Sequence, residues 1–212
     1  MSQTNGIDMQ RFMSRVEART AVDVPIVIVF GRPGAGKTTV ANKVISLFLD
    51  QSNSVIGLDL DTYVPQWMKD NFGKGIYPTP DQRREFAEGA CSKIEQEINE
   101  RHPLACILSF SFVNTDLRDV FRFRFPCAVW ALVSISEEEA NKRIAERAGH
   151  FYKGAPDAAL DSDQEEASKS VNSDWEFAPV DFPHVTLPGN DSIDDNAQRV
   201  ADVLKTTLLN RC

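Results

Sequence analysis

The sequence has few of the features that mark membrane proteins, secreted disulfide-rich proteins and nucleic-acid-binding proteins. No apolar run approaches the roughly 18 residues of a membrane-spanning helix, and the N-terminus has no basic segment followed by an apolar core. The four cysteines show no C-x-x-C spacing, so we interpret them as reduced packing residues. The 31 acidic side chains outnumber the 23 basic ones and give a net charge of −8. We therefore expect a cytoplasmic protein whose main partner is neither nucleic acid nor a membrane.

The strongest positive signal is a glycine-rich loop that meets every position of the phosphate-binding motif G-x-x-x-x-G-K-[ST]. The apolar run 25–30 precedes the loop as a short buried strand would, and apolar residues at helical spacing follow it over 40–49. The N–H groups of such a loop, with the start of the following helix, can surround a polyphosphate. The residues expected to bind ATP are Gly31, Arg32, Pro33, Gly34, Ala35, Gly36, Lys37, Thr38 and Thr39.

Two side chains of this loop have expected roles in the chemistry. We expect Lys37 to be an exposed cation that contacts the β- and γ-phosphates and takes part in catalysis. The hydroxyl of Thr38 is expected to ligate the Mg²⁺ that accompanies the nucleotide. The motif therefore predicts ATP and Mg²⁺ as cofactors.

Two carboxylates follow the next expected strand, residues 55–58. Asp59 and Asp61 come at its carboxyl end, where open α/β sheets bind ligands, so we expect both beside the phosphate loop. The third apolar run, 104–110, is followed by Ser111 rather than by the acid that motor ATPases carry there. Asp59 is therefore the expected second metal ligand, and an acidic turn that binds nothing is the alternative.

Residues 62–80 are rich in aromatic residues, glycine and proline, which is typical of an irregular cap or of a substrate-binding lobe. A capping box at 79–82 then begins a helix that ends near residue 101. Arg83 stands in the first turn of this helix, where a cation opposes the helix dipole. A bound anion would explain this arginine, and a solvated surface position is the alternative.

The second half of the chain continues the alternation of strands and helices. Residues 127–133 and 184–187 have the apolar pattern of strands, while a capping box at 136–139 and the spacing over 191–209 indicate helices. Residues 114–125 indicate a helix in their first half only, because their end alternates like a strand. This order predicts a doubly wound parallel α/β sheet with helices on both faces, formed by one domain over 1–212.

A polar, acidic and alanine-rich segment at about 149–171 carries no strand pattern. We expect it to form a lid over the phosphate loop, because such segments have little apolar surface to hold them closed without a ligand. An ordinary surface loop is the alternative.

Together these residues resemble the small-metabolite kinases of the nucleoside monophosphate kinase superfamily, which include shikimate kinase and gluconokinase. The resemblance rests on the phosphate loop, on the D-x-D of 59–61 and on an arginine-bearing helix that leads to a flap. Residues 143–151, Arg-Ile-Ala-Glu-Arg-Ala-Gly-His-Phe, are similar to an R-x-x-x-R-x-x-H-F stretch of gluconokinases. The resemblance implies a five-stranded parallel sheet of order 2-3-1-4-5 with a lid.

The same resemblance implies an ATP-dependent phosphotransferase that moves the γ-phosphoryl group to a hydroxyl of a small, anionic, polyhydroxylated metabolite. Asp61 would orient or deprotonate the acceptor hydroxyl. Arg83 and, as a second anchor, Arg118 would bind the anionic group of the acceptor. Arg143 and Arg147 would contact the ATP base or the transferring phosphate and act in catalysis.

Two other functions fit the same residues. A nucleoside or nucleotide kinase would share the ATP-binding side and would use aromatic residues of the 62–80 segment to stack a base. A nucleotide-binding regulatory module would bind ATP without transfer, although the absence of an N-K-x-D motif counts against a GTPase. In each case we expect a monomer or a homodimer whose partners are ATP and a small molecule.

Overall fold

Five parallel strands form the centre of the computed structural model, which describes residues 23–48, 55–146 and 176–209. Their spatial order is β2-β3-β1-β4-β5, and every neighbouring pair is parallel, which confirms the predicted sheet. The strands are β1 (Ile26–Phe30), β2 (Val55–Asp59), β3 (Ala105–Phe110), β4 (Val129–Ser134) and β5 (Val185–Pro188).

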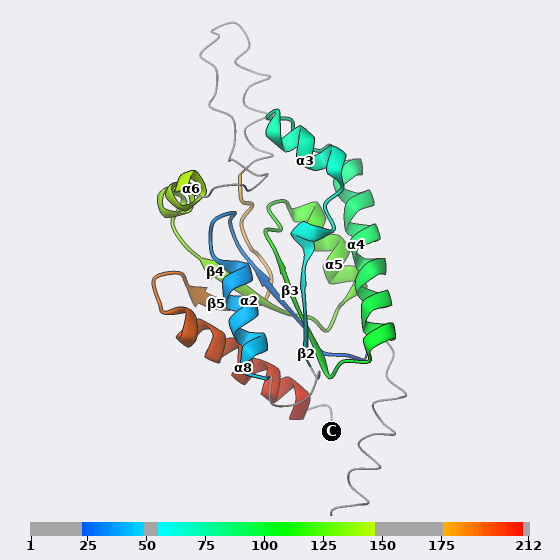
Figure 1. Ribbon diagram of the computed structural model, residues 1–212, viewed down its shortest axis with the longest axis vertical. Helices are drawn as coiled ribbons and strands as arrows, with labels where there is room; N and C mark the ends of the chain where they lie inside the picture. The colour runs from blue at the N-terminus through cyan, green and yellow to red at the C-terminus, as the bar shows by residue number, and fades with distance from the viewer. Residues whose placement is uncertain (1–22, 49–54, 147–175, 210–212) are drawn as a thin grey trace, which may run out of the picture.

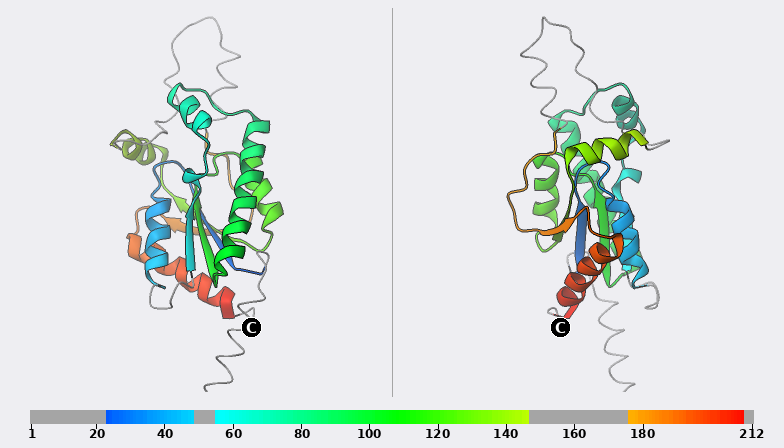
Figure 2. Two further views of the ribbon diagram at one scale, coloured as in Figure 1. Left: turned by 45° about the vertical axis from the view of Figure 1, so that its right-hand side comes forward. Right: turned by 90° about the vertical axis from the view of Figure 1, so that its left-hand side faces the viewer.

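Helices cover both faces of the sheet, as Figures 1 and 2 show. One hydrophobic cluster joins α4 and α5 to one face, and a second cluster joins α2 and α8 to the other. No helix in the described part of the chain has the length and apolar character needed to cross a membrane. The helices are α2 (Lys37–Ser46), α3 (Gln66–Gly73), α4 (Pro80–Arg101), α5 (Thr115–Arg124), α6 (Glu137–Glu146) and α8 (Ile193–Leu209).

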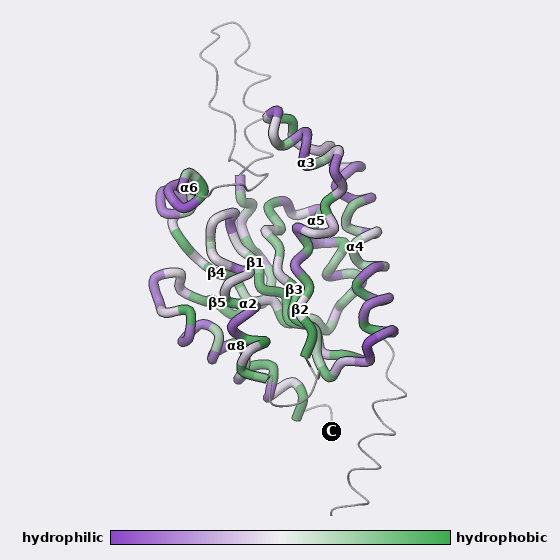
Figure 3. The backbone as a smooth tube through the Cα atoms, in the orientation of Figure 1, coloured by the Kyte–Doolittle hydropathy of each residue, from purple (hydrophilic) through white to green (hydrophobic). Residues whose placement is uncertain are grey.

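The position of β1 in the middle of the sheet explains why its sequence is continuously apolar. All five of its side chains are buried, because successive residues face the two opposite helix layers. Ile28 and Phe30 join the cluster under α4 and α5, whereas Val27 and Val29 join the cluster under α2 and α8. Hydrophobic residues accordingly gather along the strands in Figure 3, while hydrophilic residues lie along the outer helices.

The capping box predicted for α4 is present in full. The Thr79 hydroxyl accepts a hydrogen bond from the Gln82 N–H at 3.4 Å, and the Gln82 side chain accepts one from the Thr79 N–H at 3.0 Å. Pro80 occupies the first helical position, where its missing N–H costs nothing. This start fixes the first turn of α4, where the Arg83 N–H donates to the Thr79 carbonyl oxygen at 2.9 Å, and thereby positions Arg83.

The prediction for 114–125 was wrong in its second half, because α5 continues to Arg124. The apparent alternation of Phe121, Phe123 and Phe125 resembled a strand only in the sequence. Phe121 and Phe125 are buried at the four-residue spacing of a helix, whereas Phe123 is 89% exposed. The expected lid at 149–171 and Arg147 lie outside the described residues.

Candidate active site

The phosphate loop folds closely against β4 and α6. Gly31, Gly34 and Gly36 all have positive φ angles, of 152°, 82° and 90°. A Cβ atom on Gly31 would lie 2.5 Å from the Val133 carbonyl oxygen, and one on Gly34 would lie 2.6 Å from the Ala140 carbonyl oxygen. Only glycine permits both the backbone conformation and the close approach.

The side chains of the loop divide between a cavity and the protein interior. Ala35 is buried in the core under α2 and α8 and also borders a second hollow beside the loop. Arg32 forms an ion pair with Glu137 at 3.4 Å and lies over the Phe177 ring. The loop residues that line the cavity are Pro33, Gly34, Gly36, Lys37, Thr38 and Thr39.

Lys37 is not the exposed cation that the sequence predicted, because only 9% of its surface is accessible. Its Nζ donates a hydrogen bond to the Arg32 carbonyl oxygen at 2.9 Å, so the loop closes over its own lysine. The contact holds the ammonium group under the loop and within the cavity wall. This hydrogen bond restricts the lysine side chain, which lowers the entropy cost of using it to bind a ligand.

Thr38 and Asp59 lie side by side although 21 positions separate them in the sequence. The Thr38 hydroxyl donates a hydrogen bond to Asp59 Oδ2 at 3.0 Å, and Asp59 Oδ1 accepts one from the Asp61 N–H at 3.1 Å. Asp59 thereby caps the short 3₁₀ helix Leu60–Thr62, and this turn carries Asp61 to the cavity wall. The structure therefore brings together the threonine and both predicted aspartates.

The oxygen atoms of Thr38 and Asp59 fit a magnesium ion. Among the described residues, no group of three or more His, Cys, Asp or Glu side chains could hold a metal ion. Mg²⁺ does not need such a group, because it commonly takes one or two protein oxygens and completes its shell with phosphate and water. A hydroxyl and a carboxylate 3.0 Å apart beside a phosphate loop supply that partial set.

One cavity extends from the phosphate loop to residues from distant parts of the chain. Asp59 and Asp61 lie along it, and its far wall comes from α3, α4 and the end of β3. The sequence marked the 62–80 segment as a possible substrate-binding lobe, and this segment supplies part of the wall. The members from α4 onward other than Arg83 have ordinary core patterns, and sequence reasoning missed them. The described residues of this far wall are Val64, Met68, Phe72, Tyr77, Pro78, Arg83, Phe86, Phe110, Ser111, Phe112, Val113 and Leu117.

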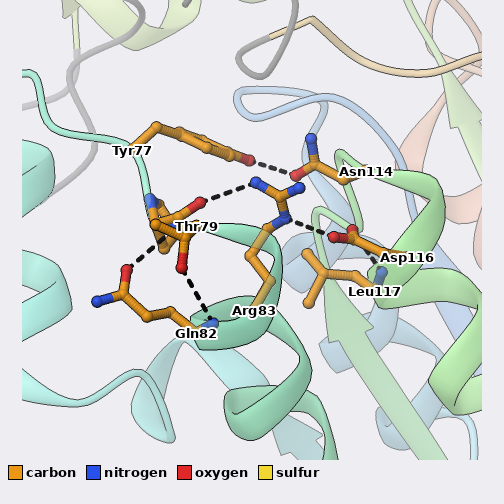
Figure 4. Close-up of polar contacts among 8 residues, drawn as sticks. Tyr77, Thr79, Gln82, Arg83, Asn114, Asp116 and Leu117 are labelled. Atoms are coloured by element: carbon orange, nitrogen blue, oxygen red, sulfur yellow. Dashed lines mark hydrogen bonds and ion pairs between the residues drawn. The ribbon is translucent and has the colours of Figure 1, made fainter.

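Arg83 lines the cavity as predicted, but it is paired within the protein. The side chain is buried, its Nε donates to Asp116 Oδ2 at 2.8 Å, and its Nη1 donates to the Pro78 carbonyl oxygen at 2.8 Å. Its guanidinium lies 5.5 Å from the centre of the Tyr77 ring, whose hydroxyl donates to Asn114 Oδ1 at 2.6 Å (Figure 4). The solvated-surface alternative for Arg83 is therefore wrong, and Asp116 balances its charge.

Arg118 does not lie on the cavity wall, and its assignment as an acceptor ligand was wrong. Its guanidinium is buried and donates to the carbonyl oxygens of Phe112, Val113, Ala178 and Pro179 at 2.7 to 3.2 Å. Burial lowers the pKa of this group to about 10, which still leaves it charged at neutral pH. Arg118 joins the loop after β3 to the segment before β5, and nothing in the local sequence of α5 signals that contact.

Arg143 lies on a second hollow at the other side of the phosphate loop. Its Nε donates to Glu139 Oε1 at 2.8 Å within α6, and about a third of its side chain remains exposed, at 36%. The hollow is bounded by Gly34, Gly36 and Thr39 on one side and by the loop between β5 and α8 on the other. No motif in the sequence marks this last loop, which Asn196 holds by donating to the Pro188 carbonyl oxygen at 2.8 Å.

Comparison with known proteins relates the fold to that of small-molecule kinases. No family model and no curated protein sequence matches the chain. A sugar kinase from Janibacter sp. HTCC2649 superposes with a TM-score of 0.63 at 20% identity, covering 86% of this chain and 95% of that one. A gluconokinase from Sinorhizobium meliloti 1021 gives 0.60 at 16% identity, with 91% and 97% covered.

A further solved structure of the same kind is the APS kinase of Mycobacterium tuberculosis in complex with AMPPNP and APS. It superposes with a TM-score of 0.56 at 16% identity, covering 86% of this chain and 98% of that one. These identities are too low to transfer a substrate, but the agreement over most of each chain is sufficient to assign the architecture. The chain has the fold of the P-loop small-molecule kinases, as its sequence predicted.

Proposed function

We propose that this chain is an ATP-dependent phosphotransferase that moves the γ-phosphoryl group to a hydroxyl of a small molecule. The observation that carries the proposal is the contact of Thr38 with Asp59 at 3.0 Å, on the same cavity as Lys37 and Asp61. A phosphate loop alone accounts for nucleotide binding. A carboxylate on a cavity that continues beyond the loop accounts for transfer to an acceptor.

The residues of the loop have complementary roles in this reaction. Its N–H groups and Lys37 bind the β- and γ-phosphates, while Thr38 and Asp59 hold Mg²⁺ directly or through water. When bound, Mg²⁺ neutralises charge that develops on the phosphate oxygens. Asp61 orients the acceptor hydroxyl and accepts its proton as the oxygen bonds to the γ-phosphorus and the bond to ADP breaks.

The hollow beside Arg143 is the proposed place for the remainder of the nucleotide. It adjoins Gly34, Gly36 and Thr39, so a nucleotide whose phosphates occupy the loop would extend into it. Arg143 lies on its wall and provides a cation there. We extend the same role to Arg147, four positions further along the sequence.

The alternatives differ in how they account for the part of the cavity that continues beyond the loop. A regulatory module that only binds ATP has no use for a cavity that continues past Asp61 between α3 and α4. A nucleoside kinase would bind its acceptor in this cavity and would share every residue that binds ATP. An anionic polyhydroxylated acceptor gains less support, because Asp116 already balances the charge of Arg83.

Substitutions of the two aspartates are expected to change different kinetic properties. Asp59→Asn should raise the Mg²⁺ concentration needed for half-maximal turnover by about tenfold or more, because it weakens a metal ligand. Asp61→Asn should lower kcat by about 100-fold with little change in the KM for ATP, because it removes the proton acceptor. Steady-state ADP release, measured across Mg²⁺ concentrations with the best acceptor from a panel of sugar acids, polyols and nucleosides, distinguishes the two effects.

Asp202→Asn is the matched control for this pair, since Asp202 is an exposed acid on α8 outside both hollows. Its kinetics should equal those of the wild type. Formation of a phosphate ester is followed separately by ³¹P NMR. Wild-type kinetics in both cavity variants would contradict the proposed transfer and favour an acidic turn without a catalytic role.

A further inference from the structure

The acceptor end of the cavity is built mainly from rings and hydrocarbon. Beyond the phosphate loop and the two aspartates, the described lining contributes five aromatic side chains and several aliphatic ones. The aromatic members are Phe72, Tyr77, Phe86, Phe110 and Phe112, and the aliphatic members are Val64, Met68, Val113 and Leu117.

The rings come from separate elements and are held in defined positions. Phe72 at the end of α3 meets Tyr77 edge to face, with ring centres 5.7 Å apart. Phe86 on α4 lies 5.5 Å from Phe110 at the end of β3, and Phe110 meets Phe112 at 5.2 Å. Phe112 is completely buried, so the core supports this second group of rings.

Two of the three polar side chains at this end of the cavity, Arg83 and Tyr77, are paired inside the protein, and Ser111 adds one hydroxyl. Asp116 and the Pro78 carbonyl oxygen each accept a hydrogen bond from Arg83, and Asn114 accepts one from the Tyr77 hydroxyl (Figure 4). A sugar acid carries a hydroxyl on nearly every carbon, and each one loses water on binding. Such a ligand would need several protein donors and acceptors to replace that water, because unpaired polar groups are costly to bury.

We infer that the acceptor is an uncharged alcohol with an aromatic or heteroaromatic body. This inference rests on the phosphotransfer proposed above, and it replaces the anionic polyhydroxylated acceptor expected from the sequence. The hydroxyl lies at Asp61, and the ring lies between the Phe72–Tyr77 group and the Phe86–Phe110 group. Edge and face contacts with these rings recognise a flat ligand without using hydrogen bonds.

The transfer balances for such an acceptor without any additional reactant. Its hydroxyl oxygen forms the bond to the γ-phosphorus, and its proton passes to Asp61 and then to water. The bond between the γ-phosphorus and the bridging oxygen breaks, and ADP leaves with that electron pair. The product is a phosphate monoester of the aromatic alcohol.

The test compares two sets of acceptors with the full-length wild-type protein, MgATP and ³¹P NMR detection of the ester. One set is pyridoxine, adenosine and uridine, and the other is gluconate, glycerate and shikimate. We expect kcat/KM for at least one member of the heteroaromatic set to exceed that of every acid by at least about 100-fold. Preferential phosphorylation of an acid would overturn the acceptor class and leave the phosphotransfer intact.

A binding measurement separates failure of this inference from failure of the proposed reaction. Isothermal titration with each compound, in the presence of Mg²⁺ and a non-hydrolysable ATP analogue, does not depend on turnover. Tighter binding of a heteroaromatic alcohol without ester formation would support the cavity assignment and contradict the transfer. Tighter binding of an acid, or no binding of any heteroaromatic alcohol, would overturn the inference.

A substitution in the ring pair tests the location of the ligand. Phe72→Leu keeps an apolar side chain but removes the ring, so the KM for the heteroaromatic alcohol should rise about tenfold while the KM for ATP stays unchanged. Phe123→Leu is the control, because Phe123 is 89% exposed on α5 and lies outside the cavity lining. Phe86→Leu provides the same test in the Phe86–Phe110 pair. Unchanged acceptor KM in both cavity variants would contradict the assignment.

Discussion

Replacing Lys37 by methionine is expected to lower kcat by about 1000-fold or more and to leave the protein folded. The substitution keeps the length of the side chain but removes the ammonium group, which alone among its atoms can stabilise charge on the transferring phosphate. Lys37 is only 9% exposed, and its Nζ donates to the Arg32 carbonyl at 2.9 Å. Loss of that hydrogen bond should lower the free energy of unfolding by about 1 kcal/mol.

The control for this experiment is Lys43→Met on the same helix. Lys43 forms an ion pair with Asp194 at 2.6 Å on the outer surface, with 41% of its side chain exposed. Its removal should leave turnover unchanged and should alter stability by less than about 1 kcal/mol. ADP release and urea unfolding are measured on both variants. Turnover of a folded Lys37→Met protein within tenfold of the wild type would refute the role given to the phosphate loop.

The parts of the site that could be predicted depend on residues close together in the sequence or on the order of the strands. The phosphate loop is contiguous, and the glycines at 31, 34 and 36 by themselves indicate a backbone with positive φ angles. The capping box at 79–82 fixes the start of α4 in the same local way. Asp59 could be placed beside Thr38 because parallel strands end at one edge of the sheet, a rule that needs only the order of elements.

The parts that could not be predicted depend on contacts between distant segments. Phe86 and Phe110 fit the patterns of an ordinary helix and an ordinary strand, and only folding brings their rings to the cavity that Phe72, from the predicted 62–80 segment, also lines. The burial of Lys37 could not be predicted from the sequence either, because it depends on a contact with the backbone of the phosphate loop. A charged side chain in a helix is normally interpreted as solvated or ligand-binding, so the internal partners of Arg83 were equally hidden.

Arg118 illustrates the same limit and leads to the largest expected effect on stability. Arg118→Met should lower the free energy of unfolding by more than about 3 kcal/mol, because four carbonyl groups would lose their hydrogen bonds from this buried guanidinium at once. The groups concerned are those of Phe112, Val113, Ala178 and Pro179. Phe112 also has a positive φ of 48°, an uncommon conformation for a bulky residue that the arginine helps to hold.

Two further variants make the Arg118 experiment decisive. Arg118→Lys retains a charge but not a planar group that reaches all four carbonyls, so its stability should lie between those of Arg118→Met and the wild type. Arg122→Met, one turn along α5, removes a half-exposed arginine paired with Asp119 and should cost less than about 1 kcal/mol. Urea unfolding gives the stabilities, and acceptor KM is measured on each folded protein. A stable Arg118→Met protein whose only defect is a raised acceptor KM would restore Arg118 as a substrate ligand and remove its structural role.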